Sequence, residues 1–425
     1  MVRPPITEST DSSANRMVHE LASLHFEAPQ AEARIEVGRP GRELCLYPGR
    51  LGYDLQEELD FLSNRAMEPN VFFTGRFLAP AMPRLDDRQV KLALMRDDNG
   101  KRSRMRFLMP FSIDKPGFSV GPSIMRGWSN DFSPLGTPLI DSEDAAETLD
   151  NLFEAFASRQ MNLPATLVLP DLRLNGLFAQ MAKAVAISRN QPVTVTNTYQ
   201  RPMLQSSQEA DAYLQNAISS SHMREMRRQW RLLEEKGEVS YNVARQPREI
   251  RQRLEEFLTM EAKGWKGKNR SALIFDRYHS PFVREAIANL SEIDAVRIHT
   301  IDVDGKAIAS LVVLMMGGEA YTWKTAYNED YARFSPGKLL MGRLTEWHLE
   351  DANIVRSDSC AVPDHPIMSR FWREREEMGT LVIGLAQNSD RDVRQVANQL
   401  HMYRSTRNMA KLLRNRILSL TGRGG

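Results

Sequence analysis

Apolar residues recur along this chain at two spacings, and the order in which the two spacings occur is repeated. A recurrence every three to four residues predicts a helix with one buried face, and strict alternation predicts a half-buried strand. A first strand is expected within residues 35–47, where the regular patterns begin. The rest of the first half predicts, in order, helices at 55–64 and 76–82, strands at 90–95 and 104–113, a helix at 142–159, a strand at 165–169, a helix at 176–188 and a strand at 193–199.

The second half repeats this succession. Its patterns predict helices at 209–218, 222–236, 249–263 and 281–290, strands at 295–303, 306–316 and 320–326, a helix at 338–350, and strands at 354–359 and 381–385. In each half a hairpin glycine, Gly100 or Gly305, precedes a Phe-Ser-Pro sequence at Phe132 or Phe334, and a helix follows. The shared order favours a duplicated α+β unit. The alternative is that Asp-Gly turns and Ser-Pro helix starts are simply common.

The chain is therefore divided into four segments. Residues 1–30 are polar and without periodic apolar positions, so a flexible tail is predicted. An N-terminal domain spans 31–204, and a C-terminal domain spans 205–390. From residue 391 onward eight basic residues face a single acid, Asp392, which predicts a basic amphipathic helix. This helix either packs on the second domain, the reading we favour, or lies on an anionic membrane as a peripheral contact.

Composition narrows the functional classes. Hydrophobic residues make up 42% and charged residues 26%, as in globular proteins, and a net charge of +2 gives no reason to expect DNA as a partner. No segment has the ~20 consecutive apolar residues of a membrane span, and the N-terminus lacks the apolar stretch of a secretory signal. Cys45 and Cys360 fit neither a disulfide framework nor a zinc spacing, and the histidines are scattered. A cytoplasmic protein without a metal is expected.

The segment from Tyr321 to Leu340 carries the most chemical information. A predicted strand runs through a polar, aromatic loop into a helix that begins with Ser335, Pro336, Gly337 and Lys338. Proline is harmless in a first helical turn, and glycine lets a ligand approach the backbone. The free N–H groups of this turn would hold a pyrophosphate, with Lys338 adding positive charge. The alternative is an ordinary helix capped by Ser335.

Several motifs occur in the order found in one known family. The sequence Trp323-Lys324-x-x-Tyr327-x-x-x-Tyr331-x-x-x-Ser335-Pro336-Gly337-x-Leu339-Leu340 resembles the CelD-type acetyltransferases, named for an association with bacterial cellulose biosynthesis. A basic helix at 224–231 and a Glu-x-x-x-Trp-Lys-Gly stretch at 261–267 also fit, although this family often has Ser in place of Gly264. The resemblance is strongest over residues 205–375 and fades through the first half.

The resemblance implies a fold and a reaction. The family is similar to GNAT N-acyltransferases and, more distantly, to the Fem-type enzymes that add amino acids to peptidoglycan precursors. The implied fold is α+β, with tandem GNAT-like domains and mixed sheets flanked by helices. The implied reaction transfers an acyl group from acyl-CoA, such as acetyl-CoA, to a small-molecule or saccharide amine in polysaccharide or envelope metabolism. The alternatives are a Fem-like transferase that uses aminoacyl-tRNA, and an inactive GNAT-fold scaffold.

Acyl transfer to an amine needs a base, a proton donor for the departing thiolate, and hydrogen bonds to the developing oxyanion. Glu261 lies at a predicted helix end beside Trp265, and partly apolar surroundings make a carboxylate more basic. His365 follows a strand and suits base catalysis at neutral pH. We favour Glu261, because it belongs to the matching stretch, and Tyr327 is the candidate proton donor. Each also has a plain structural explanation, as a cap, a surface loop residue and a packing residue.

The acyl donor is expected at Ser335–Lys338 and the acceptor near five further residues. These are Trp265, Lys266, Trp323, Lys324 and Asp358. Asp358 or Asp364 would orient His365 or bind the acceptor amine. The arginines at 224, 227, 228 and 231 share one helix face, which is either a solvated surface or a site for an anionic acceptor, the CoA nucleotide or RNA.

Overall fold

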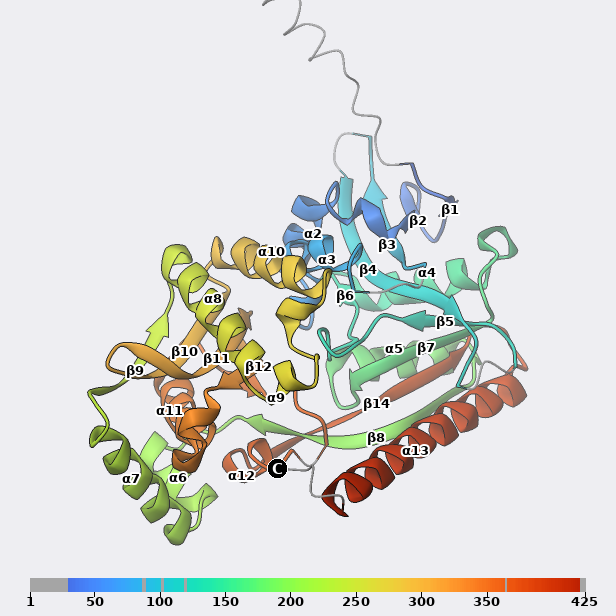
Figure 1. Cartoon of the computed structure of the whole chain (residues 1–425). Coiled ribbons are helices and arrows are strands. Elements are labelled where there is room, and N and C mark those ends of the chain that lie inside the picture. The colour runs from blue at the N-terminus through green and yellow to red at the C-terminus, as the bar shows by residue number, and fades with distance from the viewer. Residues whose placement is uncertain (1–29, 86–88, 101–102, 118–120, 364, 421–425) are drawn as a thin grey trace, which may run out of the picture.

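The computed structural model describes residues 30–85, 89–100, 103–117, 121–363 and 365–420. The tail expected at 1–30 lies outside the described residues except for its last position. Within the described part, 14 strands form one mixed sheet with helices on both faces (Figure 1). The predicted α+β class with helix-flanked mixed sheets is confirmed.

The first half contains β1 (Ala33–Glu36), β2 (Arg42–Pro48), α2 (Gln56–Ser63), α3 (Gly75–Ala81), β3 (Lys91–Asp98), β4 (Ser103–Asp114), β5 (Ile124–Gly127), β6 (Leu139–Ile140), α4 (Ala145–Ala157), β7 (Thr166–Arg173), α5 (Leu177–Ser188) and β8 (Val193–Leu204). The second half contains α6 (Ala210–Ala217), α7 (Ser220–Glu234), β9 (Val239–Ala244), α8 (Pro247–Lys263), α9 (Trp265–Lys268), α10 (His279–Ser291), β10 (Val296–Val303), β11 (Lys306–Met316), β12 (Glu319–Tyr327), α11 (Pro336–Glu350), β13 (Arg356–Asp358), α12 (Met368–Phe371), β14 (Glu374–Gly384) and α13 (Asp390–Leu420).

The two halves have the same order of elements. The succession β2-α2-α3-β3-β4-β5-α4-β7 corresponds to β9-α8-α10-β10-β11-β12-α11-β13. In each half two parallel strands, β5 with β7 and β12 with β13, are joined through a helix, α4 or α11. The remaining neighbours in each half are antiparallel. The duplicated unit predicted from the sequence is therefore present in the fold.

The halves exchange strands where they meet. The sheet order is β2-β3-β4-β5-β7-β14 on one side and β9-β10-β11-β12-β13-β8 on the other, with β14 and β8 paired in the middle. Strand β14, near the C-terminus, therefore lies beside β7 of the first half, and β8 lies beside β13 of the second. Figure 1 shows both long strands running along the shared sheet. The backbone hydrogen bonds are thus continuous across residue 204.

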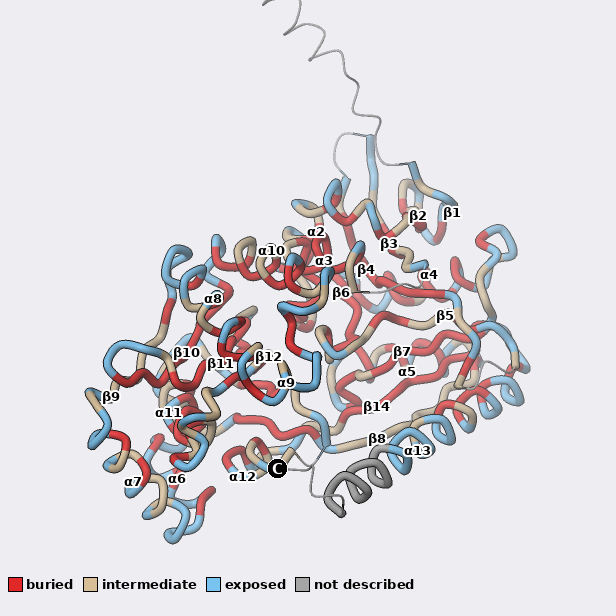
Figure 2. The backbone as a smooth tube through the Cα atoms, viewed as in Figure 1, coloured by how far each residue is buried: buried red, intermediate tan, exposed pale blue. Residues whose placement is uncertain are grey.

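The hydrophobic core is also shared. Helices α3 and α10 pack on each other over one face of the sheet, and one cluster of buried side chains draws on both halves. Aromatic rings link them: Phe77 lies 5.3 Å from Phe282 and 6.0 Å from Trp323, and Phe72 lies 5.5 Å from Tyr321, between ring centroids. Burial is continuous along the middle of the sheet, whereas the outer faces of α7 and α13 are exposed (Figure 2).

Helix α13 confirms a helix in the basic C-terminal segment, but its packing differs from the expectation. Val393 and Leu400 pack against Ile124, Val168 and Val382, which belong to β5, β7 and β14. The helix therefore packs on the predicted second domain only through β14, and otherwise on β5, β7 and β8 of the first half. The physical reason is the strand exchange, because α13 directly follows β14 and β14 lies beside β7 (Figure 1). Peripheral membrane contact through this segment stays a prediction.

Candidate active site

The candidate site lies where two parallel strands separate. Strands β12 and β13 pair over Glu319–Tyr321; β13 ends at Asp358, whereas β12 continues to Tyr327. Strand β12 also contains a bulge: on β11, Val313 pairs with Thr322 and Val312 with Lys324, so Trp323 is the extra residue. A bulge bends its strand and redirects the side chains that follow it. The local backbone thus opens a gap in the sheet.

A pocket of about 360 Å³ lies beside this last part of β12 and the start of α11. One wall comes from the end of α8 and from α9, a second from the end of β12, and a third from the first turns of α11 and from the loop before α12. Its lining brings together nine residues predicted from the sequence: Glu261, Trp265, Lys266, Tyr327, Ser335, Pro336, Gly337, Lys338 and His365. The pocket therefore reaches from one face of the sheet to the other.

The start of α11 presents backbone to this pocket. Ser335 occupies the cap position with a left-handed backbone (φ 51°), and its side chain makes no capping hydrogen bond. Pro336 has no N–H, and the N–H groups of Ser335 and Lys338 donate to the carbonyl oxygens of Ala332 and Ser335, each at 2.9 Å, so among the described residues the N–H of Gly337 is the donor left without a backbone acceptor in this turn. Gly337 faces open space, since a β-carbon built on it would meet no atom within 4 Å. A helix start with an open glycine and a nearby lysine, here the half-buried Lys338, is a type of position at which proteins bind anions, and an anion site here stays a prediction.

Glu261 is held from two sides. Its side chain is 2% exposed, and one carboxylate oxygen accepts a hydrogen bond from Lys266 Nζ at 2.7 Å. The other oxygen accepts from the backbone N–H of Leu273 at 2.8 Å. The turn between them is tight, because a β-carbon on Gly267 would lie 1.7 Å from the carbonyl oxygen of Ala262. The Glu-x-x-x-Trp-Lys-Gly stretch therefore folds as a clamp that fixes one wall of the pocket.

His365 presents a hydrogen-bond donor rather than a free lone pair. Its Nδ1 lies 3.3 Å from the backbone N–H of Met368 and accepts a hydrogen bond from it. Burial lowers the pKa of His365, so the ring is neutral at pH 7 and its single proton is placed on Nε2. A neutral ring in this tautomer suits donation to a carbonyl or oxyanion.

Two aromatic side chains remain accessible at the pocket. Trp265 is 51% exposed and Tyr327 is 36% exposed, and both line it. Tyr327 is the last residue of β12, and its role as a proton donor stays a prediction. Among the described residues there is no group of three or more histidine, cysteine, aspartate or glutamate side chains that would hold a metal ion.

Comparisons with known proteins bear on this geometry. Residues 220–356 match the family model described as an acetyltransferase (GNAT) domain. This part of the chain is a GNAT-type acetyltransferase domain. It includes the clamp, β12 and most of the pocket, while β13 beyond Arg356 and the pocket residue His365 lie outside it. The CelD-type subfamily stays a prediction. Among curated proteins, none matches the sequence.

Solved structures resemble the whole tandem arrangement around the GNAT domain. The crystal structure of FemX has a TM-score of 0.50 at 8% identity, covering 80% of this chain and 98% of its own. The C-terminal domain (DUF2156) of a putative lysylphosphatidylglycerol synthetase from Agrobacterium fabrum has a TM-score of 0.49 at 12% identity, covering 81% and 95%. A tandem GNAT protein from the clavulanic acid biosynthesis pathway has a TM-score of 0.37 at 12% identity, covering 81% and 99%. At these identities the likeness concerns the fold.

Three predicted residues of the GNAT domain and its surroundings do not line the pocket. Trp323 is buried and donates from Nε1 to the carbonyl oxygen of Phe132 at 2.8 Å. Lys324 donates to the carbonyl oxygen of Asp131 at 3.0 Å. Both of these hydrogen bonds go to a loop of the first half. The third predicted residue that does not line the pocket is Asp358.

Asp358 belongs to buried ion pairs that join the halves. It is fully buried and lies 3.4 Å from Arg173 and 3.2 Å from Arg201, counted between nitrogen and oxygen. It also accepts from the backbone N–H of Cys360 at 2.7 Å. Although burial raises the pKa of Asp358, the two guanidinium groups hold it below the usual value. Asp364, the other suggested partner of His365, lies outside the described residues.

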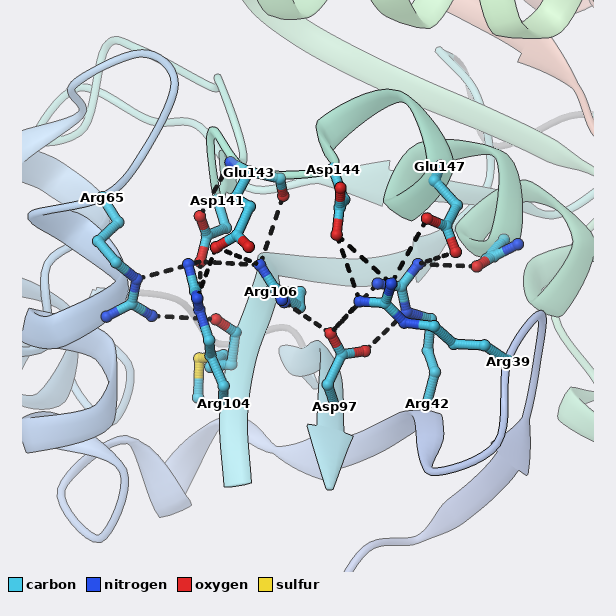
Figure 3. Close-up of polar contacts among 12 residues, drawn as sticks. Arg39, Arg42, Arg65, Asp97, Arg104, Arg106, Asp141, Glu143, Asp144 and Glu147 are labelled. Carbon is cyan, nitrogen blue, oxygen red and sulfur yellow. Dashed lines mark hydrogen bonds and ion pairs between the residues drawn. The ribbon is translucent and has the colours of Figure 1, made fainter. Parts of the chain in front are cut away.

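The corresponding helix start in the first half is also uncapped, but it is surrounded by acids. The helix that corresponds to α11 is α4, and the acids around its start are engaged by arginines (Figure 3). Asp141 accepts from Arg65 at 3.0 Å and from Arg104 at 2.8 Å. Nearby, Asp97 accepts from Arg42 at 2.7 Å, and although burial raises its pKa, arginine hydrogen bonds hold that pKa well below the usual value. The start of α4 thus lies among carboxylates, whereas the first turn of α11 contains no acid.

The sequence analysis did not identify the apolar residues that line the pocket. They are Met260, Leu311, Ala326, Met341, Ile367 and Met368, and the polar Thr325 was missed with them. On helices and strands they have the same spacing as core residues, so periodicity does not separate them from the core. They come together only in the folded chain, because they belong to α8, β11, β12, α11 and the segment around α12.

Proposed function

We propose that this protein is an N-acyltransferase that takes its acyl group from an acyl-CoA, acetyl-CoA being the simplest donor. The observation that carries the proposal is the uncapped start of α11 opening onto a pocket at the split of β12 and β13. The backbone around Gly337 and the side chain of Lys338 are suited to the donor's pyrophosphate. Its thioester, which supplies the activated acyl group, would then extend into the gap.

The groups at the pocket meet two requirements of the reaction. As the acceptor nitrogen bonds to the acyl carbon, negative charge grows on the acyl oxygen, and Nε2–H of His365 is a suitable donor to it. When the carbon–sulfur bond breaks, the thiolate needs a proton, and the hydroxyl of Tyr327 is the candidate source. The apolar lining excludes water from competing with the amine. Glu261 and Lys266 hold the wall rather than react.

The acceptor is proposed on the resemblance alone. It is an amine on a small molecule or saccharide, and the setting is polysaccharide or envelope metabolism in a bacterium. Trp265, exposed at the pocket, offers a flat apolar surface to such an acceptor.

Thermal melting with ligands tests the proposal. A ligand that binds only the folded protein stabilises it by about 2.7 kcal/mol at 100 times its dissociation constant. Melts are recorded with CoA, acetyl-CoA and longer acyl-CoAs, with adenosine as the control for unspecific effects. We expect the CoA compounds to raise the melting temperature. No shift at millimolar concentration of any of them contradicts the proposal and favours the scaffold or the tRNA alternative.

One observation favours the second candidate, aminoacyl transfer from tRNA. The arginines of α7 are exposed, and among the described residues only Arg228 is ion-paired, at 2.7 Å from Glu225, whereas Arg224, Arg227 and Arg231 have no acidic partner. Helix α7 contacts α11 near the anion site. Filter binding of tRNA, repeated with these three arginines changed to glutamine, decides between the candidates. Tight binding that the changes abolish, without any CoA effect, supports the tRNA donor.

A further inference from the structure

Helix α13 packs on the sheet through its first part. The buried residues of its first turns belong to a cluster with side chains of β5, β7 and β14. Further along the helix, the guanidinium carbon of Arg404 lies 4.7 Å from the ring centroid of Tyr199 on β8. Residues 405–410 are all exposed (Figure 2), yet the helix continues to Leu420. At the usual rise per residue, this second part of α13 is about 24 Å long.

The side of α13 that faces away from the sheet carries apolar residues. Val393 and Leu400 are seven residues apart, so they share one face of the helix, and both are buried. Met402 lies two residues beyond Leu400, a rotation of about 200°, so Met402 and Met409 share the opposite face. Their exposed fractions are 52% and 64%. In the sequence, apolar residues continue this spacing at positions 413, 417 and 420.

The charge of this helix has one sign beyond its first turn. From Val393 to Gly425 the sequence contains seven basic residues and no acid. Three of them, Arg394, Arg404 and Arg407, have described side chains, and none of the three makes an ion pair with a described residue. A helix with this charge attracts an anionic surface and repels a basic one.

These two features together favour a lipid surface over a nucleic acid. A helix with an apolar face and a basic polar face is typical of segments that lie in the surface of an anionic bilayer. The anionic headgroups attract the basic residues, and the apolar side chains enter the boundary between headgroups and acyl chains. A nucleic acid would use the basic residues but leave Met402 and Met409 exposed to water.

We propose that α13, from Met402 onward, docks on an anionic lipid bilayer. The bilayer would lie on the side of α13 opposite the sheet, with Met402 and Met409 toward the acyl chains and the basic residues close to the headgroups. Because the first part of the helix is packed on the sheet, docking would hold the whole protein at the lipid surface. This inference does not depend on the proposed acyl transfer.

Co-sedimentation of the whole protein with vesicles tests the proposal. Vesicles of phosphatidylcholine alone are compared with vesicles that also contain phosphatidylglycerol, and we expect binding to the second kind. Each basic residue near an anionic surface contributes about fivefold in affinity, so a triple variant, Arg407→Gln, Lys411→Gln, Arg414→Gln, should lose about 10²-fold. A double variant, Met402→Gln, Met409→Gln, keeps the charge but removes apolar contact, and it should lose about tenfold or more.

The matched control removes three positive charges elsewhere. Arg248 and Arg251 of α8 and Lys306 of β11 are exposed, and their combined change to glutamine should leave vesicle binding as in wild type. Thermal melting shows whether each variant is folded, and the wild-type comparison of the two kinds of vesicle needs no variant.

Three results would overturn the inference. Wild type could fail to bind the phosphatidylglycerol vesicles, or could bind both kinds equally. The triple variant of α13 could bind them as tightly as the matched control does. Finally, wild type could bind tRNA but not vesicles, with the tRNA binding lost in the triple variant, and the basic helix would then serve a nucleic acid instead.

Discussion

Replacing Lys266 by methionine removes the ammonium group from a carboxylate that has almost no contact with water. Glu261 would keep its hydrogen bond from Leu273 N–H but lose the 2.7 Å ion pair. Loss of one partner from a buried ion pair costs about 3–5 kcal/mol. Because the Lys266 side chain is 25% exposed, we expect the lower end, about 3 kcal/mol.

A surface pair in the same helix provides the control. Lys268 pairs with Glu329, but its side chain is 68% exposed, so Lys268→Met should destabilise the protein far less than Lys266→Met. Urea unfolding, followed by tryptophan fluorescence, gives the free energy of unfolding of both variants. The two values are compared on the condition that the free energy depends on urea concentration with the same slope. In the double variant Glu261→Gln, Lys266→Met, no charge remains buried, and we expect most of the lost stability to return.

The same variants test whether Glu261 clamps the pocket wall. In Lys266→Met the wall between residues 264 and 273 loses one of its two attachments, so acyl-CoA affinity should fall together with stability. If Lys266→Met costs no more than Lys268→Met and leaves affinity unchanged, the clamp is refuted. Glu261 would then be free to act as the base, as the sequence motif led us to favour.

Two further outcomes concern the buried polar groups. Burial lowers the pKa of His348 to about 3, so below the unfolded value of about 6.5 the unfolded chain binds a proton that the native state does not. At pH 5 this difference lowers the free energy of unfolding by about 2 kcal/mol. Urea unfolding at pH 7.5 and 5.0 should show a smaller loss in His348→Asn than in wild type. An equal loss in the variant would refute this assignment. Asp358→Asn leaves Arg173 and Arg201 buried without their shared carboxylate, so calorimetry should show about 3 kcal/mol of destabilisation in a single transition of both halves, and a stable variant or two separate transitions would contradict the shared junction.

The sequence predicted the elements well where periodicity was strong and poorly where burial and polarity conflict. The strand predicted at 306–316 coincides with β11. The helix predicted at 249–263 ends where α8 ends, and α8 begins only two residues earlier, at Pro247. The strand predicted at 381–385 runs from Glu374 to Gly384. Its first residues are glutamate and arginine, which read as a loop, yet they pair with β8 in the middle of the sheet. The short strands β5 and β9 were missed, since four to six residues give little periodicity.

The candidate site was predictable as a set of residues but not as a set of roles. The motif positions from Glu261 to His365 were named together, and the pocket brings nine of them to one place. What the sequence did not show is which side chains are already bonded. Asp358 reads as a reactive loop carboxylate, but its partners Arg173 and Arg201 lie 185 and 157 residues away in the chain. The strand exchange that brings them together depends on tertiary pairing.

The central claim is that an acyl-CoA binds with its pyrophosphate at the start of α11. Isothermal titration of acetyl-CoA into wild type, Gly337→Ala and Gly337→Asp tests it most directly. A β-carbon at Gly337 meets open space, so alanine should preserve fold and binding, whereas aspartate places a negative charge where the phosphates are expected. The account predicts one site per chain in wild type and in Gly337→Ala, and no measurable heat in a folded Gly337→Asp. Equal binding by all three proteins, or no binding by wild type, would contradict it.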